Sequence, residues 1–387
     1  MPILNRVAEM HDEVTGWRRH LHTIPELLYD VHQTAAFVED KLKAFGCDEV
    51  VPAIGRTGVV GIIRGTLGDG PVIGLRADMD ALPLDEITGA PHASQTPGKM
   101  HACGHDGHTA MLLGAAKYLA ETRNFKGTVA VIFQPAEEGG AGGKAMVEDG
   151  LMDRFGITRV FGMHNMPGLP VGQFAIRPGP IMAATAEFTV TVKGKGGHAA
   201  MPHGTIDPIV IGSQMVQALQ TIAARSVDPI DSVVVSVTKF HAGDAYNIIP
   251  QEAQFAGTIR TLRDEVGEAA RSRLRAICEG IAAAPGASAD VQIDINYPVT
   301  YNDPDETVFV SGVAREVAGE PQVHTAINPV MGGEDFSYML NARPGAFIFA
   351  GNGDTANLHN PAYDFNDELI PHGVSYWVKL AETALAR

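Results

Sequence analysis

The sequence predicts an α/β protein with a mostly parallel central sheet, interrupted by a smaller α+β insertion. Short apolar runs at residues 59–64, 72–77, 128–133 and 160–165 have the length of buried strands. Stretches with helical spacing alternate with these runs, which is typical of a parallel sheet covered on both faces. Between residues 184 and 297 the strands instead alternate polar and apolar residues, which indicates one solvated face.

Two helices are expected before the first strand. Residues 7–21 carry apolar side chains at three- and four-residue steps, and Pro25 prevents further helix. Residues 34–45 form the second helix, which ends at Gly46. A third helix is expected from His108 to about residue 120, so the polar residues before it lie on a loop that opens into a helix.

The insertion has its own element order. Strands are expected at 186–193, 232–240, 252–261 and 289–296, with helices at 206–224 and 264–284. This βαββαβ order is the ferredoxin-like arrangement. We therefore divide the chain into a discontinuous domain of residues 1–183 and 298–387 and an inserted domain of residues 184–297. After the insertion we expect a helix at 305–318, a buried strand at 346–350 and a final helix from His372.

Charge and composition exclude several classes of partner. The chain has 387 residues and a formal net charge of −16, which disfavours nucleic acid and anionic membrane surfaces. No run of about 18 apolar residues predicts a membrane-spanning helix, and the N-terminal stretch lacks an apolar signal core. Three scattered cysteines do not make a disulfide framework, so we expect a reducing, cytoplasmic location.

The eight residues from His101 to His108 predict a metal site. They contain three histidines, one cysteine and one aspartate. A cysteine thiolate and a neutral imidazole are good ligands for zinc-like ions, and Gly104 lets Cys103 and His105 turn toward one point. An ordinary polar loop is the alternative, but this density of ligand types favours the metal. Asp106 and His108 are equally well interpreted as supporting or as purely structural residues.

Polar residues also follow three of the predicted buried strands. Asp78 and Asp80 follow one strand, Glu137 and Glu138 follow the next, and His164 ends a third. The carboxyl ends of parallel strands meet at one edge of a sheet, where ligands bind. Metal-bound histidines usually need an orienting partner, so we expect Asp78 and Asp80 to support the ligands. A glutamate pair on a loop is most often solvated, but its place after a buried strand favours a functional role.

Seven short segments together resemble one family. They are RADMDALP (76–83), HACGHDGH (101–108), FQPAEEGG (133–140), MHN (163–165), KGGHAAMPH (195–203), GGEDF (332–336) and the late His359. These motifs resemble, in order and over nearly the whole chain, the hippurate hydrolase branch of the dinuclear aminoacylase–carboxypeptidase family, whose members cleave N-acyl amino acids.

The resemblance implies a zinc-peptidase-like α/β/α catalytic domain, an inserted lid or dimerisation domain, and two divalent metal ions per subunit. The ions would be zinc, manganese, cobalt or nickel. The implied ligands are Cys103, His105, Glu138, His164 and His359, and Glu137 would be the general base that activates a metal-bridging water. Better-known members carry His-x-Asp where this chain has Asp78 and Asp80, and an aspartate bridge at Cys103. The assignment of ligands to the two ions therefore stays open.

The resemblance also implies residues that contact the substrate. His198 would reach the active site of the partner subunit and stabilise the oxyanion, so a homodimer or homotetramer is expected. Asn247 and Arg260 would bind the substrate carboxylate, for which the planar fork of an arginine is well suited. Gly333 would form part of the backbone wall of the substrate pocket.

Three alternatives to an N-acyl-amino-acid amidohydrolase follow from the same residues. A metallo-dipeptidase or carboxypeptidase could use the same scaffold. A non-catalytic metal-binding module is disfavoured because Glu137 and every implied ligand are present. A hydrolase that uses the Cys103 thiol as nucleophile would be insensitive to chelators, whereas a metal-dependent enzyme would not.

Overall fold

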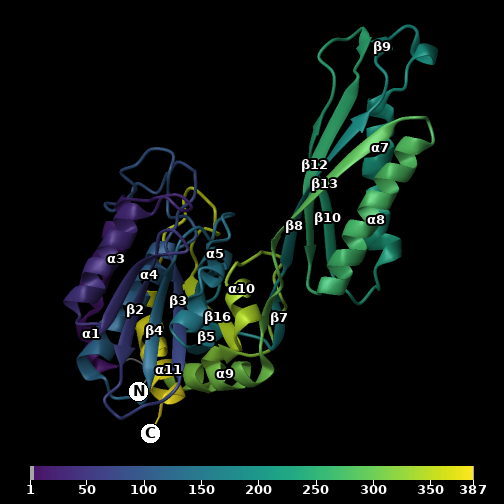
Figure 1. The fold of residues 1–387 in the computed structure, drawn as a ribbon. Helices are drawn as coiled ribbons and strands as arrows, with labels where there is room; N and C mark the ends of the chain where they lie inside the picture. Colours follow the sequence, from purple (N-terminus) through teal and green to yellow (C-terminus); the bar gives the residue numbers. More distant parts are fainter. Residues whose placement is uncertain (1–3, 387) are drawn as a thin grey trace. The chain divides into compact units, whose positions relative to one another are not determined.

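The computed structural model describes residues 4–386, and the chain divides into two compact units (Figure 1). The first unit comprises residues 4–181, 301–328 and 335–386, and the second comprises residues 182–300 and 329–334. Two short strands, β7 (Gly179–Met182) and β14 (Thr300–Asn302), pair where the chain passes from one unit to the other and back.

The first unit is built on a central sheet of mixed direction. Its strand order is β1-β2-β4-β3-β5-β16-β6-β15. The strands are β1 (Glu49–Ile54), β2 (Gly58–Arg64), β3 (Val72–Asp78), β4 (Thr128–Gln134), β5 (Ile157–Pro167), β6 (Phe174–Ala175), β15 (Val323–His324) and β16 (Gly345–Gly353). The pairs β4/β3, β3/β5 and β5/β16 are parallel, whereas β1/β2, β2/β4 and β16/β6 are antiparallel. The predicted α/β fold with a mostly parallel centre is therefore confirmed.

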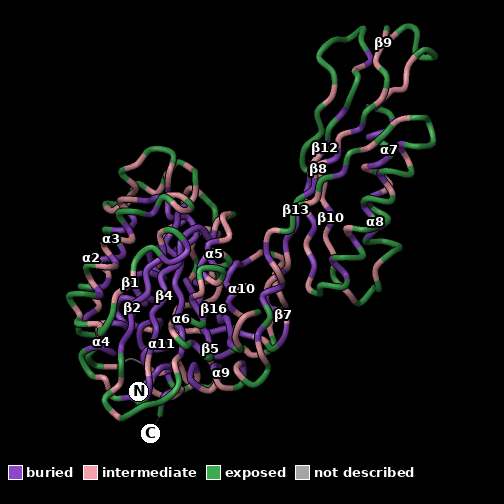
Figure 2. Tube along the Cα trace, viewed as in Figure 1, coloured by how far each residue is buried: buried purple, intermediate pink, exposed green. Residues whose placement is uncertain are grey.

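Helices bury the central strands. The helices of this unit are α1 (Asn5–Glu9), α2 (His11–Thr23), α3 (His32–Ala44), α4 (His105–Thr122), α5 (Gly142–Glu148), α6 (Leu151–Arg154), α9 (Pro304–Ala318), α10 (Ser337–Ala342) and α11 (Ile370–Ala384). Helix α4 packs on β3 and lies between α2 and α11. Most of its residues are buried, because its small side chains allow close approach on several sides. Figure 2 shows the buried residues running along the central strands and α4.

Two helices of the first unit depart from the prediction. The helix expected from His108 begins at His105, directly after Gly104, which adopts a left-handed conformation. His105 and His108 therefore lie three residues apart on one helical face. The first helix is also divided at Met10, although the apolar face of Val7, Met10 and Val14 stays buried across the break. The apolar spacing alone could not indicate that interruption.

The second unit has a four-stranded antiparallel sheet and two long helices. Its main elements are β8 (Ala184–Lys193), α7 (Pro208–Leu219), β10 (Val233–His241), β12 (Glu252–Thr261), α8 (Asp264–Ala283) and β13 (Ser288–Tyr297). The strand order is β10-β12-β8-β13, which with the βαββαβ connectivity is ferredoxin-like. One face of the sheet packs against both helices around Phe188 and Phe255. A small ladder of β9 (Gly197–His198) and β11 (Ile248–Ile249) completes the unit.

The helix expected at residues 206–224 ends earlier than predicted. Regular α-helix stops at Leu219, and a π-helical turn follows at residues 222–226. Nowhere in residues 4–386 is a helix both long enough and apolar enough to cross a membrane.

Candidate metal centre

Glycine geometry shapes the turn that carries Cys103 and His105. Gly104 has φ +89°, and a β-carbon there would lie 2.5 Å from Asn165 Oδ1 and 2.6 Å from the Tyr363 hydroxyl. An L side chain would therefore meet both an unfavourable backbone angle and occupied space. With glycine at this position the chain passes close to Asn165, and Cys103 and His105 come to face the same region.

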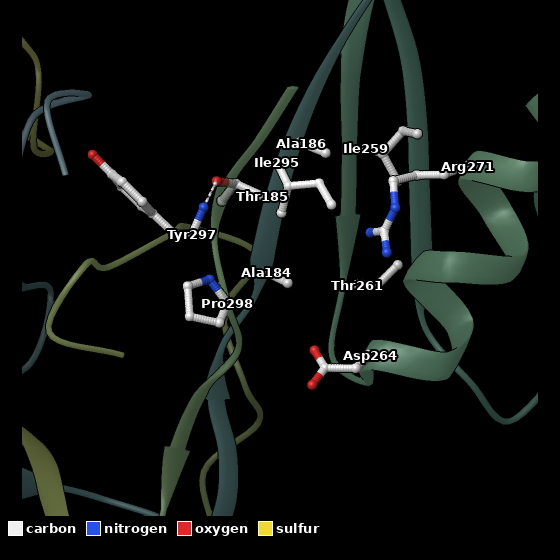
Figure 3. A pocket seen from close by; sticks show the side chains of 10 residues that line it. All are labelled: Ala184, Thr185, Ala186, Ile259, Thr261, Asp264, Arg271, Ile295, Tyr297 and Pro298. Carbon is white, nitrogen blue, oxygen red and sulfur yellow. Dashed lines mark hydrogen bonds between the residues drawn. The ribbon is translucent and has the colours of Figure 1, made fainter. Parts of the chain in front are cut away.

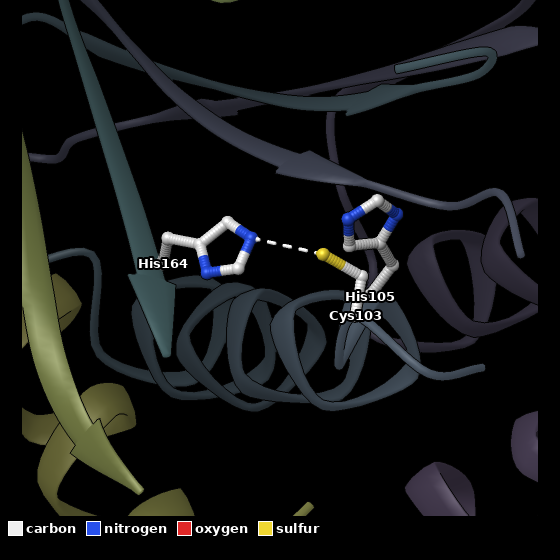
Figure 4. A group of neighbouring side chains, drawn as sticks. All are labelled: Cys103, His105 and His164. Carbon is white, nitrogen blue, oxygen red and sulfur yellow. Dashed lines mark hydrogen bonds between the residues drawn. The ribbon is translucent and has the colours of Figure 1, made fainter. Parts of the chain in front are cut away.

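Two groups of potential ligands share the Cys103 thiol. The ligand atoms of Cys103, His105 and His164 all lie within 4.8 Å of one another. Figure 4 shows the thiol directed at the His164 ring, with Sγ 3.4 Å from Nε2. Cys103 forms a second group of this kind with Glu138 and His359. All five residues proposed as ligands from the sequence thus converge at one place in the first unit.

Backbone carbonyls fix the orientation of two of the histidines. His105 Nδ1 lies 2.8 Å from the carbonyl oxygen of Asp80, and His164 Nδ1 lies 2.7 Å from that of Asn165. A carbonyl oxygen can only accept a hydrogen bond, so both Nδ1 atoms must donate. In the neutral ring that binds a metal, this assignment leaves Nε2 as the atom with a free lone pair, and it is Nε2 that faces the other ligands.

Two buried atoms of this group lack a hydrogen-bond partner within the described residues. They are His105 Nε2 and Glu138 Oε1. Glu138 Oε1 lies 3.2 Å from His359 Nε2, but the pair does not have hydrogen-bond geometry. Buried acceptors without donors are costly, whereas a cation between them would satisfy both. A thiol, imidazoles and a carboxylate are also the donor set that zinc-like ions prefer, so these residues fit a metal centre.

The charges around the group favour a cation as well. Burial raises the pKa of the Cys103 thiol well above its ordinary value, and the neighbouring Glu138 and Glu137 carboxylates raise it further. Burial lowers the pKa of His105, but the carboxylates of Asp78 and Asp80 outweigh it and bring the pKa to about 10. The raised pKa of His105, and the carboxylate part of the Cys103 shift, indicate negative charge in the cluster, which a divalent ion would offset.

Asp80 supports both glutamates through its carboxylate. Its Oδ1 accepts the Glu137 backbone N–H at 2.9 Å, and its Oδ2 accepts that of Glu138 at 3.0 Å. The turn begins at Ala136, whose φ of +55° is unusual for a residue with a β-carbon. Asp80 therefore holds the turn from which Glu137 and Glu138 both approach His105. The carbonyl oxygen of Asp80 is the nearer acceptor for His105 Nδ1, at 2.8 Å, and the Asp80 carboxylate predicted for this role lies 3.5 Å from the same nitrogen.

Asp78 lies in a separate buried network on the other side of His105. Its Oδ1 is 2.6 Å from His108 Nδ1, and its Oδ2 accepts a hydrogen bond from Arg76 at 2.6 Å. Arg76 also donates to Asp335 at 3.0 Å. Asp78 could itself contribute an oxygen to a metal, because it forms a ligand-type group with His105 and His108. The sequence reasoning missed Arg76 and Asp335, although a lone arginine within an apolar strand was a usable signal.

His359 differs from the other four potential ligands in exposure and conformation. Its side chain is 53% exposed, whereas the Cys103 residue is 7% exposed. Its φ is +62°, and its backbone N–H donates to the carbonyl oxygen of Ala102 at 2.8 Å. The loop that carries His359 is thus attached to the segment just before Cys103, and His359 lies on the solvent side of the cluster.

The four residues predicted to contact substrate lie in the second unit. His198 is exposed on β9, and its ladder partner Ile248 directly follows Asn247. Arg260 is half-buried on β12, and burial lowers its pKa. A β-carbon on Gly333 would lie 2.3 Å from Thr185 Cγ2, so this position has no room for a side chain unless Thr185 moves.

The second unit also contains a hollow of about 120 Å³ (Figure 3). Ile259 and Thr261 line it on β12, together with Asp264 and Arg271 of α8. Successive side chains of a strand point to opposite faces, so Arg260 points away from this hollow. None of the four predicted substrate residues lines it.

Comparison with known proteins identifies similar chains. The model of a family described as peptidase family M20/M25/M40 matches residues 74–383. Hippurate hydrolase from Campylobacter jejuni is 42% identical over 381 residues, which cover 98% of this chain and 99% of that protein. An N-acetyl-L-cysteine deacetylase from Bacillus subtilis is 41% identical over 367 residues, covering 94% of this chain and 86% of that one.

One solved structure is similar over nearly the full length. It is a dinuclear metal-binding peptidase of the M20 family from Bacillus subtilis, with a TM-score of 0.85 and 37% sequence identity. The match covers 98% of this chain and 99% of that one.

Proposed function

The chain belongs to peptidase family M20/M25/M40 and is a hydrolase of amide bonds, and from that premise we propose that it cleaves N-acyl amino acids into a carboxylate and a free amino acid. Hippurate and N-acetyl amino acids are the substrate types that we favour, because the names of two relatives, hippurate hydrolase and N-acetyl-L-cysteine deacetylase, specify such compounds. The observation that carries the proposal is the convergence of five donor side chains beside Glu137.

We propose that these five donors would hold two divalent ions, with Cys103 belonging to both ligand groups. One ion would be held by Cys103, His105 and His164, and the other by Cys103, Glu138 and His359, which follows the two groups found in the structure. The chemistry that such a pair supplies when bound is polarisation of the scissile carbonyl and a lowered pKa for water. Zinc, manganese, cobalt and nickel all suit these ligands.

Glu137 is the residue that we propose as general base. It is buried to 7% exposure, and its carboxylate belongs to the same close group as His105 and Glu138. Asp80 fixes its backbone, so its side chain is held at the cluster by a rigid turn. In the proposed reaction the carboxylate takes a proton from the attacking water and gives it to the leaving nitrogen when the C–N bond breaks.

We further propose that the second unit acts as a lid and makes the contact between subunits of a homodimer or homotetramer. His198 is exposed beside Ile248, which is 57% exposed, and Met201, which is 59% exposed. Exposed apolar side chains that lie together, as these two do around His198, support an interaction surface. The roles of His198 at the oxyanion, of Asn247 and Arg260 at the substrate carboxylate, and of Gly333 in the pocket wall stay predictions.

The proposal is tested by a substrate panel with the wild type and Glu137→Ala. The panel contains N-benzoyl and N-acetyl amino acids together with dipeptides that have a free α-amine. We expect hydrolysis of the acylated compounds, loss of activity with EDTA and recovery after a divalent ion is added. The variant should retain its metal, by elemental analysis, but lose at least a hundredfold in turnover.

Three outcomes would contradict parts of this proposal. A strong preference for a free α-amine would favour a dipeptidase or carboxypeptidase. Full activity in EDTA combined with inactivation by thiol alkylation would favour a nucleophilic Cys103. High activity of metal-loaded Glu137→Ala would exclude Glu137 as the base.

A further inference from the structure

A second buried polar cluster adjoins the metal centre but contains none of its proposed ligands. It joins four parts of the first unit: helix α2, the first turn of α4, the extended segment before α4 and the segment before α11. We call these residues the anchor cluster, and they are Arg18, His22, Glu86, His92, Asp106, Asp364 and Asp367.

Arg18 is the centre of the anchor cluster. Arg18 is fully buried, and its guanidinium contacts three carboxylates from two segments that are far apart in the sequence. Nε donates to Asp367 at 2.7 Å, and Nη1 donates to Asp364 at 3.1 Å and lies 3.6 Å from Asp106. A buried arginine with several carboxylates in fixed positions acts as a rigid joint, because its planar fork allows few alternative geometries.

The carboxylates that Arg18 joins belong to the two segments that carry metal ligands. Asp106 directly follows His105, which the turn at Gly104 places beside Cys103. Asp364 and Asp367 lie on the segment that carries His359. Arg18 therefore spans the two sides of the second ligand group, with Cys103 on one side and His359 on the other.

Other contacts show that these two segments are closely fitted to each other. The His359 N–H donates to the Ala102 carbonyl oxygen at 2.8 Å. A β-carbon on Gly107, in the first turn of α4, would lie 2.3 Å from the Phe365 ring. The segment before α11 is thus seated directly on the first turn of α4, and Arg18 supplies the charge that holds two acidic residues of that segment there.

His22 reinforces the α4 side of the joint. Its Nδ1 lies 2.8 Å from Asp106 Oδ2, and its Nε2 lies 3.3 Å from Glu86. Arg18 and His22 are four residues apart on one face of α2, so a single helix presents both groups to Asp106. The Asp106 carboxylate is consequently held from one side, which fixes the rotation of the helical turn that carries His105.

We infer that Arg18 is a positioning residue for the metal centre, which sets the spacing between Cys103 and His359 by joining Asp106 to Asp364 and Asp367. This inference rests on the proposed function, because it assumes that the two residues belong to one metal site. Arg18 itself touches neither ion nor substrate. Loss of the Arg18 side chain is expected to lower the metal affinity of the site of Cys103, Glu138 and His359 more than that of the site of Cys103, His105 and His164.

The test is a metal titration of the apo-protein with wild type, Arg18→Met and the control Arg19→Met. Arg19 also contacts Asp367, at 2.9 Å, but its side chain is 52% exposed. Dissociation constants for zinc are measured by competition with a chromophoric chelator, and cobalt absorption reports the coordination of the thiolate. Arg18→Met should weaken one of the two sites, assigned to Cys103, Glu138 and His359, by about 10- to 100-fold, which is typical when a supporting partner of a metal ligand is lost; the other site should change much less. Arg19→Met should bind both ions as the wild type does.

Asp364→Asn provides a second variant if Arg18→Met does not fold. It removes the negative charge of the half-exposed Asp364 and leaves the Arg18–Asp367 contact intact. A smaller loss of metal affinity at the same site is therefore expected. A folded Arg18→Met, or failing that Asp364→Asn, with both dissociation constants within twofold of the wild type would overturn the inference. A lower melting temperature with unchanged metal affinity would overturn it as well, because a purely structural role predicts that result. A wild type that binds two ions but cleaves no N-acyl amino acid would instead contradict the proposed substrate. The ratio of the metal affinities of Arg18→Met and the wild type would still decide the role of Arg18.

Discussion

The substitution Asp80→Asn tests how the turn that carries Glu137 is held. Asp80 is 1% exposed, and each oxygen of its carboxylate accepts one backbone N–H, from Glu137 at 2.9 Å and from Glu138 at 3.0 Å. Asparagine has the same shape but only one acceptor oxygen. Its amide nitrogen would face one of the two N–H groups, which would then be buried without an acceptor.

The expected magnitude follows from these two hydrogen bonds. A hydrogen bond to a charged group contributes about 1.5–3 kcal/mol, and a buried unsatisfied donor costs a similar amount. If the loss displaces Glu137 and so raises the activation free energy by about 1.5–3 kcal/mol, kcat/KM falls by about 10- to 100-fold. Burial raises the pKa of Asp80. Because a protonated carboxyl cannot accept both hydrogen bonds, kcat/KM of the wild type should approach that of the variant as the pH falls.

The assay is kcat/KM at saturating metal on the best substrate of the panel, with metal content measured in parallel. Asp85→Asn is the matched control, because Asp85 accepts one backbone N–H, from Gly98 at 2.7 Å, in an exposed loop of the same segment. The control should behave as the wild type. A metal-replete Asp80→Asn within threefold of wild-type activity would refute the idea that Asp80 positions the base.

Two further predictions concern stability. Burial opposes protonation of His22, but the Asp106 carboxylate outweighs it and raises the pKa of His22 to about 9. Protonated His22 therefore stabilises the folded protein by about 3 kcal/mol. This stabilisation is complete below the ordinary pKa of about 6.5 and is lost as the pH rises through 9. Urea unfolding of His22→Gln should show a flatter pH profile over this window, and a slope as steep as that of the wild type would contradict the pairing. Gly104→Ala should destabilise by about 2–4 kcal/mol, from the left-handed backbone and the clash with Asn165. Gly46→Ala, at φ +77° with no atom within 4 Å of the new β-carbon, should lose only about 1 kcal/mol, and equal losses in the two variants would exclude the clash.

The sequence predicted the layout of the first unit because apolar runs and helical spacing are local properties. The buried strands β3 and β4 and the helix α4 between them were found from that signal. The pairing order was not readable, because β16 joins β5 across an intervening insertion. The two-residue strands β6 and β15 are too short to leave a pattern. The start of α4 was placed three residues late, because the left-handed cap at Gly104 has no periodic signal.

The metal centre was partly predictable for a similar reason. Polar residues at strand ends gave the locations of Asp78, Glu137 and His164 without knowledge of the fold. The orientation of the histidine rings depends on carbonyl oxygens, which every residue has, so no side-chain pattern could indicate it. The role of Arg18 was equally hidden, since its partner Asp364 is 346 residues away in the chain.

The position of His359 near the end of the chain has a consequence for biosynthesis. Four of the five donors are translated before the second unit, whereas His359 follows it. At ordinary elongation rates of about 5–20 residues per second, the ribosome needs roughly 10–40 s to proceed from His164 to His359. During this interval the nascent chain would offer a cation at most four of the five proposed protein ligands. If the five residues hold the ions as proposed, the full set of donors exists only after His359 has been translated.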